Sequence, residues 1–215
     1  MDNNGFYCYA DFPQPPGWLI ADVIKSAELG HRFNRNLKFR QRPANTEEDF
    51  KVFQETLHEF KISDKTYSRA SYRRYGISDE TIQWVKDNIG EFSDCSCQLM
   101  RDGSAFLPHT DGGPRRYIIN YLIKAGGNNV ATQFFIEHGK ELIREGTPLH
   151  VNNSDELDLV ESIIAPEKSW MVMFGKVIHA VAGLESPRIQ LSIALSAEEF
   201  LKVKERFNLT LKYYG

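Results

Sequence analysis

The first ninety residues carry apolar side chains at helical spacing. From Thr46 to Phe60, apolar residues recur every three or four positions behind a T-x-x-D start signal, which predicts an amphipathic helix. A second helix is predicted from Ser78 to Gly90, because serine is a favoured N-cap residue and glycine commonly follows the end of a helix. The segment from Trp18 to Gly30 has a similar pattern and is interpreted as a third helix.

After Gly90 the apolar runs are short, and glycine, proline, asparagine or aspartate separates them, as in strands joined by turns. Eight strands are predicted, at residues 94–100, 116–123, 131–139, 141–146, 147–152, 169–175, 176–183 and 188–196. Short strands behind a helical front predict a mainly β fold with flanking helices, in the form of a double-sheet barrel or jelly roll.

One domain, residues 1–215, is expected from the length of the chain. Within it we expect a mostly helical buttress at 1–90, the β core at 91–200 and a C-terminal segment at 201–215. The hydrophobic fraction of 41% and charged fraction of 26% are ordinary for a globular protein. No apolar run is long enough to span a membrane, and the polar N-terminus does not resemble a signal peptide.

The net charge of −3 gives the chain no general attraction to nucleic acid or to an anionic membrane. The cysteines are Cys8, Cys95 and Cys97, and the spacing of the last two suits neither a zinc knuckle nor a CxxC redox pair. They are interpreted as unpaired strand thiols in a reducing compartment, which makes the cytoplasm the expected location.

Candidate metal ligands interrupt the apolar segment Phe106–Ile123. His109 and Asp111 lie at i and i+2, so on an extended strand their side chains point the same way and can bind one metal ion. A surface turn explains this pair equally well, so a third ligand is needed. His179 is the candidate, because it stands at the start of an apolar strand, although a core histidine is the usual occupant of such a position. Two histidines and one carboxylate form the facial triad of non-haem Fe(II) sites, which leaves three coordination positions open.

An arginine opens the otherwise apolar strand RIQLSIAL, nine positions after His179. Burying an unpaired guanidinium is expensive, so Arg188 requires an anionic partner, and a carboxylate matches its two parallel donors. The partner is either structural, with Glu185 or Asp158 as candidates, or the far carboxylate of a 2-oxo acid that chelates the metal.

The second half of the chain, roughly Cys95 to Ser196, resembles the Fe(II)- and 2-oxoglutarate-dependent dioxygenases, and it is most similar to their prolyl 4-hydroxylase-like branch. The motifs that carry the resemblance are FLPHTD, NYL, WMVMFGKVIHAV and RIQLSIAL. In that branch the first histidine follows aromatic-x-Pro, the second follows a strand that ends in an apolar-Phe pair, and the basic residue that binds 2-oxoglutarate comes later at a similar spacing. His109, His179 and Arg188 match these positions.

The resemblance implies a double-stranded β-helix fold of the jelly-roll or cupin-like type, and a hydroxylase. Fe(II), held by His109, Asp111 and His179, would work with 2-oxoglutarate as cosubstrate and O2 as oxidant. The substrate would be a peptide, including a prolyl peptide, or a small molecule, and succinate and CO2 would be released. Related halogenases have glycine or alanine at the position of Asp111, so the aspartate favours hydroxylation.

The resemblance also implies the cosubstrate contacts. Arg188 would hold the distal carboxylate, helped by Tyr121 and Ser192, and Tyr117 shares the strand parity of Tyr121. A second cosubstrate tyrosine of the branch is replaced by Met100 in this sequence.

Two other functions stay open. The segment Tyr67–Gly76 interleaves tyrosine and arginine and, with Arg115 and Arg116, indicates a nucleic-acid-modifying oxygenase. The acidic chain disfavours this reading, as does the lack of a second arginine near Ala194, which the nucleic-acid demethylase branch usually carries. A non-catalytic cupin-like module that binds metal or sugar would need no arginine at a fixed distance from His179.

Overall fold

The structure is a computed structural model, which describes residues 5–29, 59–62, 65–68, 72–101, 105–112, 115–141, 151 and 154–211. Its larger sheet has the strand order β1 (Tyr7–Ala10), β10 (Trp170–Phe174), β7 (Tyr117–Lys124), β12 (Arg188–Leu195), β5 (Asp94–Met100) and β4 (Tyr72–Tyr75). Its smaller sheet has the order β6 (Phe106–His109), β11 (Ile178–Ala182), β8 (Ala131–Glu137) and β9 (Leu157–Ile163), with a 3-10 turn at Ser154–Glu156 before β9. A separate hairpin joins β2 (Glu59–Ile62) to β3 (Lys65–Ser68).

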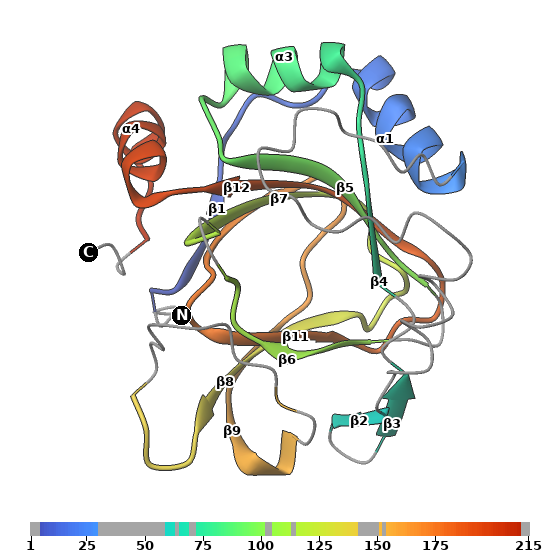
Figure 1. Ribbon diagram of the computed structural model, residues 1–215, viewed down its shortest axis with the longest axis vertical. Helices are drawn as coiled ribbons and strands as arrows, with labels where there is room; N and C mark the ends of the chain where they lie inside the picture. The colour runs from blue at the N-terminus through green and yellow to red at the C-terminus, as the bar shows by residue number, and fades with distance from the viewer. Residues whose placement is uncertain are drawn as a thin grey trace.

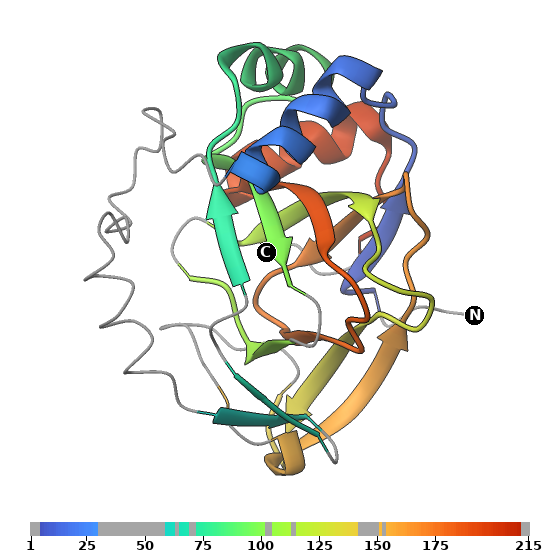
Figure 2. The ribbon, with the colours of Figure 1, turned by 90° about the vertical axis from the view of Figure 1, so that its right-hand side faces the viewer.

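The two main sheets face each other, and three helices cover the outer side of the larger one (Figure 1). These helices are α1 (Gly17–Leu29), α3 (Asp79–Asn88) and α4 (Ala197–Phe207). A view from the side shows the same order of layers, with the helices above the larger sheet and the smaller sheet below it (Figure 2). The strands that pair within these sheets are antiparallel. The prediction of a mainly β, double-sheet jelly roll with flanking helices is therefore confirmed.

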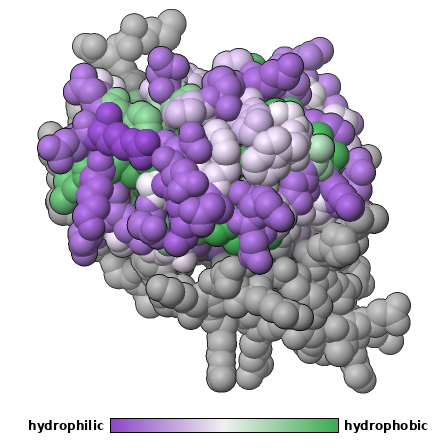
Figure 3. Space-filling view, turned by 90° about the horizontal axis from the view of Figure 1, so that it is seen from above, coloured by the Kyte–Doolittle hydropathy of each residue, from purple (hydrophilic) through white to green (hydrophobic). Residues whose placement is uncertain are grey.

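Strand alternation gives the larger sheet an apolar face under the helices and a mixed polar and apolar face on the other side. In β12, Ile189, Leu191 and Ile193 point toward the helices and belong to the main hydrophobic cluster. Arg188 and Gln190 point the other way and line a cavity. The helix layer thus completes the hydrophobic core on one side, and the cavity between the sheets is lined by polar side chains together with apolar ones such as Met171 and Met173. Seen from above, the described residues on the helix-covered face are mostly hydrophilic, with smaller apolar patches between them (Figure 3).

Two of the three predicted helices are confirmed. The segment 18–30 corresponds to α1, and 78–90 corresponds to α3. Ser78 caps α3 by accepting a hydrogen bond from the backbone of Thr81, and the stripe of Ile82, Val85 and Ile89 is buried. Most of the helix predicted at Thr46–Phe60 lies outside the described residues. Its last two residues begin β2, so the prediction is wrong there.

Six of the eight predicted strands are confirmed, as β5, β7, β8, β10, β11 and β12. The other two, 141–146 and 147–152, lie mostly outside the described residues. Pattern reasoning missed β1, β4 and β9. Of these, β1 and β4 lie before Gly90, in the segment expected to be mostly helical, and form the two edge strands of the larger sheet. Pattern reasoning also missed α4, although Ser196 and Glu199 form a capping box that the sequence displays as S-x-x-E.

The three cysteines are free and buried, in β1 and β5, as predicted. Among the described helices, none is long and apolar enough to cross a lipid bilayer.

Candidate metal centre

The pairing of β6 with β11 places two histidines side by side. His109 and His179 are register partners on these antiparallel strands, and their ring centroids are 4.3 Å apart. Asp111 follows β6, where its backbone N–H donates to Gly175 O at 2.8 Å. The three potential ligand atoms of His109, Asp111 and His179 lie within 4.8 Å of one another, close enough to hold one metal ion. The structure thus brings together the three residues that the sequence singled out.

Both histidines are oriented in the same way. Nδ1 of His109 lies 2.9 Å from Leu107 O, and Nδ1 of His179 lies 2.9 Å from Val177 O. A carbonyl oxygen only accepts hydrogen bonds, so Nδ1 carries the proton and Nε2 of a neutral ring offers its lone pair to a metal. Burial lowers the pKa of His179, although the nearby Asp111 raises it, and the ring is therefore neutral at neutral pH.

The carboxylate is held between an arginine and the histidines. Arg115 Nε donates to Asp111 Oδ1 at 2.9 Å, and Oδ2 lies 3.5 Å from His179 Nε2. Burial alone would raise the pKa of Asp111, but Arg115 and the two histidines outweigh it and hold the pKa below its ordinary value. Asp111 is therefore charged at neutral pH, as a metal ligand must be.

A glycine makes room for the carboxylate. A Cβ atom built on Gly175 would lie 2.6 Å from Arg115 O and 3.0 Å from the Cβ of Asp111. Any side chain at this position would therefore push against the segment that carries the ligand. Lys176 Nζ donates to Asp111 O at 3.0 Å and fixes the same backbone from another side.

Arg188 reaches the same cavity from β12 and is only 3% exposed. Its guanidinium makes two long hydrogen bonds to neutral acceptors, Gln190 Oε1 at 3.4 Å and Ala125 O at 3.5 Å. Across the described residues it forms no ion pair, and neither Glu185 nor Asp158 serves as its partner. Burial lowers its pKa to about 10, so the side chain still carries a positive charge at neutral pH. The cavity wall therefore holds a buried cation that no anion of the described residues neutralises.

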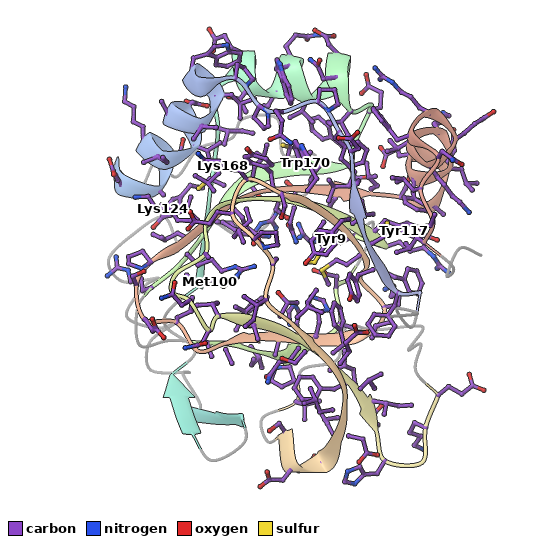
Figure 4. All side chains as sticks on the ribbon, turned by 180° about the vertical axis from the view of Figure 1, so that it is seen from behind. Tyr9, Met100, Tyr117, Lys124, Lys168 and Trp170 are labelled. Atoms are coloured by element: carbon purple, nitrogen blue, oxygen red, sulfur yellow. The ribbon has the colours of Figure 1, made fainter. Side chains whose placement is uncertain are left out.

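The cavity that these residues share has a volume of about 470 Å³. Its larger-sheet wall carries polar residues that pattern reasoning missed: Arg74, Gln98, Asn120 and Gln190. Gln190 donates to Gln98 at 2.7 Å, whereas Asn120 Oδ1 is buried and has no hydrogen-bond partner among the described residues. The available signal was the parity of β12, because Gln190 shares a face with Arg188. Met100 lies between the two sheets and also lines the cavity (Figure 4).

Tyr117 and Tyr121 face away from this cavity, which corrects the expectation that they contact a cosubstrate. They share one face of β7, as predicted, but it is the helix-covered face. Tyr117 stacks on Phe200 of α4 at 3.8 Å, and the Tyr121 hydroxyl donates to Gln14 at 3.0 Å. Figure 4 shows Tyr117 on the side of the sheet where α4 lies. The intervening Asn120 faces the cavity instead.

Ser192 has the inward parity of Arg188 and Gln190 but does not line the cavity. It is fully buried opposite Asn120 and Ser96, and its hydroxyl has no hydrogen-bond partner within the described part of the chain. Its predicted contact with a cosubstrate stays a prediction.

The described part of the segment Tyr67–Gly76 places one arginine inside the protein. Arg74 forms an ion pair with Asp94 and donates to Ser96 Oγ at 3.1 Å. This pairing matches the alternative in which the basic residues of the segment bind acidic groups of the protein itself.

Comparison with known proteins supports the fold. A scan against protein-family models gives no match, and a search of curated protein sequences finds no significant match. Among solved structures, the fold is similar to SnoK, a non-haem α-ketoglutarate-dependent carbocyclase of nogalamycin biosynthesis, with a TM-score of 0.50 and 9% identity over 90% of this chain and 81% of that one.

Two further structures are matched less closely. A prolyl-4-hydroxylase from Pseudomonas putida gives a TM-score of 0.41 and 12% identity over 90% of this chain and 94% of that one. A 2OG-Fe(II) oxygenase family protein from Burkholderia pseudomallei gives a TM-score of 0.40 and 11% identity over 85% of this chain and 92% of that one. At 9% identity, the similarity to SnoK concerns the fold alone.

Proposed function

We propose that this protein is an Fe(II)- and 2-oxoglutarate-dependent oxygenase that hydroxylates a C–H bond of a peptidyl, including prolyl, or small-molecule substrate. One observation carries the proposal: Arg188 is a buried, charged guanidinium that pairs with no anion among the described residues, and it lines the same cavity as the cluster His109, Asp111 and His179. A metal-binding module of the cupin-like type has no need for such an arginine. A cosubstrate that chelates the metal at one end and carries a carboxylate at the other needs both the metal ligands and the arginine.

The donor set fits Fe(II). Two neutral imidazoles and one carboxylate, with open positions beside them, are typical of non-haem Fe(II) oxygenases. Each imidazole is fixed by its Nδ1 proton, and the carboxylate is fixed by Arg115, so the ligands are oriented by the protein itself. When bound, the iron would activate O2 for oxidation of the substrate, with 2-oxoglutarate supplying the remaining electrons as it is converted to succinate and CO2.

The protein residues have three tasks in this proposal. His109, Asp111 and His179 bind the metal, and Arg188 neutralises and orients the distal carboxylate of 2-oxoglutarate through two parallel N–H donors. The cavity wall of Gln98, Asn120 and Gln190 offers further hydrogen bonds. A volume of about 470 Å³ lies within the usual range for small-ligand sites, so cosubstrate and a reacting substrate group can share it.

The substrate class is argued from the site, because the fold supports many reactions. Asp111 occupies a ligand position, which favours hydroxylation over halogenation. Of the two alternatives, modification of nucleic acid is less favoured, since Arg74 points inward to Asp94 and is not presented to a phosphate backbone. Three buried free thiols suit a reducing compartment, and the proposal places the protein in the cytoplasm.

The test is a paired titration under anaerobic conditions, first with Fe(II) and then with 2-oxoglutarate, followed by the charge-transfer absorption of the chelate. Arg188→Lys keeps the charge but loses the planar fork, so 2-oxoglutarate binding should weaken by roughly tenfold or more. Arg188→Gln should weaken it further, because a charged hydrogen bond contributes about 1.5–3 kcal/mol. Fe(II) affinity should change little in either variant.

The matched control is Arg206→Gln, which removes an exposed arginine that donates to Asp87 O and lies over Phe207. It should bind 2-oxoglutarate like the parent protein. Equal 2-oxoglutarate affinity in the parent and in Arg188→Gln would refute the assignment of Arg188, and a parent that forms no succinate with any substrate panel would refute the oxygenase.

A further inference from the structure

We infer that Arg115, anchored by Asp94, is a positioning residue that keeps Asp111 a one-oxygen ligand and so preserves an open coordination position on the metal. This inference rests on the proposed metal site and deepens it. It concerns the side chains of Arg115 and Asp94, which are not among the proposed metal ligands.

The two oxygens of Asp111 have separate partners. Oδ1 accepts a hydrogen bond from Arg115 Nε at 2.9 Å, and Oδ2 is the oxygen that lies 3.5 Å from His179 Nε2. The side chain of Asp111 is 13% exposed, so water competes weakly for either oxygen. A hydrogen bond from an arginine to one carboxylate oxygen competes with a metal for that oxygen, so it favours coordination through the other oxygen alone.

Arg115 is itself held from behind. Its Nη1 donates to Asp94 Oδ2 at 2.9 Å, and its side chain is 13% exposed. Asp94 also pairs with Arg74, which is fixed in turn by hydrogen bonds to Ser96 Oγ at 3.1 Å and 3.2 Å. The row of charges starts on β4, crosses β5 and ends at the ligand. Because a guanidinium is planar and rigid, fixing Nη1 on Asp94 also fixes the direction in which Nε points at Asp111.

The number of open positions depends on this arrangement. Two imidazoles and one carboxylate oxygen leave three positions on a six-coordinate ion, and a 2-oxo acid that chelates through two atoms leaves one for O2. If Asp111 bound through both oxygens, that last position would be filled. Arg115 therefore protects the vacancy that the proposed reaction requires.

The experiment counts exchangeable water on bound Mn(II), a redox-quiet substitute for Fe(II), by the relaxation of water protons at saturating metal. Arg115→Gln frees Oδ1 for the metal, so the relaxation enhancement should fall by roughly one third, from three open positions to two. After addition of 2-oxoglutarate the parent should keep one exchangeable water and the variant should keep none. Asp94→Asn, which leaves Arg115 in place but unanchored, should shift both values in the same direction.

Lys202→Gln serves as the control, because Lys202 forms an exposed ion pair with Glu198 on α4, outside the cavity. This variant should show the same relaxation enhancement as the parent. A parent that shows no relaxation enhancement with Mn(II) would refute the metal site itself. A parent that binds Mn(II), together with an unchanged water count in both Arg115→Gln and Asp94→Asn, would refute only the positioning role. Because the metal is saturating, a loss of affinity or stability alone does not alter the count.

Discussion

At the scale of single residues, the candidate site is built from short-range contacts. Each histidine sends its Nδ1 proton to the carbonyl two residues earlier, so the extended strand itself selects the tautomer. The carboxylate needs more: a backbone bond to Gly175, and a charged neighbour, Arg115. Because the site is buried, the loss of any of these contacts would cost more free energy than at the surface, since an unpaired charge in this cavity is poorly solvated.

Gly175 gives the clearest prediction at this scale. Gly175→Ala places a methyl group 2.6 Å from Arg115 O, and backbone at that distance must move. We expect a loss of about 1–3 kcal/mol in the free energy of unfolding, as for other overpacked sites, and weaker Mn(II) binding because Asp111 is displaced. Urea denaturation and metal titration measure the two effects.

Gly17→Ala is the matched control, because no atom lies within 4 Å of a Cβ built at Gly17. This variant should unfold and bind metal like the parent. If Gly175→Ala also behaved like the parent in both measurements, close packing around Asp111 would not be a requirement of the site.

At the scale of elements, the alternation of each strand decides which side chains reach the cavity. β7 shows this most plainly, because Tyr117 and Tyr121 contribute to the core under the helices, whereas Asn120 faces the metal side. A shift by one residue would exchange the two sets. The packing of apolar side chains under the helices therefore fixes the register of the strand, and this register decides which polar side chains face the cavity.

Tyr121→Phe and Asn120→Ala test this assignment of faces. Tyr121→Phe loses the hydrogen bond to Gln14, which we expect to cost about 1 kcal/mol of stability, but it should leave 2-oxoglutarate affinity unchanged. Asn120→Ala should weaken 2-oxoglutarate binding, because it removes a carboxamide from the cavity wall. Titration of both metal-bound variants with 2-oxoglutarate measures the difference. If Tyr121→Phe alone lost 2-oxoglutarate affinity, the assignment of the two faces of β7 would be wrong.

At the scale of the whole molecule, the main core is centred away from the candidate metal ligands, although Ile118, Met171 and Met173 belong to the core and also line the cavity. The largest hydrophobic cluster joins the helices to the outer face of the larger sheet and includes Phe12, Val85 and Phe200. A smaller cluster lies around Leu107 and Phe135, on the other face of the smaller sheet from the histidines. The metal ligands stand between these layers, so folding does not depend on the metal for its apolar burial.

Removal of metal should therefore leave a folded protein of lower stability. With a chelator present, we expect native far-ultraviolet circular dichroism and a cooperative unfolding transition. Addition of Mn(II) at 100 times its Kd should raise the free energy of unfolding by about 2.7 kcal/mol, through binding to the native state alone. His179→Ala should lose this increment, and His138→Ala, which changes an exposed histidine beside Asp158, should keep it. A chain that unfolds on chelation would contradict the separation of core and site.

The sequence by itself determined six strands of the second half, two helices and the three candidate metal ligands that the structure brings together. These features depend on local periodicity, on capping residues such as Ser78, and on residue types that are rare in apolar strands, as His179 and Arg188 are. Each can be read from neighbours in the chain, because side-chain direction and helix ends follow from a few adjacent residues. The edge strands β1 and β4 were missed because they are four residues long and depend on their sheet partners.

Only the tertiary structure decided which face of each strand looks into the cavity. Parity showed that Tyr117 and Tyr121 share a face, but either face of a buried strand is apolar enough to accept a tyrosine. The packing of α4 and of Gln14 on that face settled the choice. The same holds for Arg74, Asp94 and Arg115, which come from separate elements and meet beside Asp111 because the sheet brings β4 and β5 together. Contacts between residues so distant in sequence depend on sheet order, which no local pattern contains.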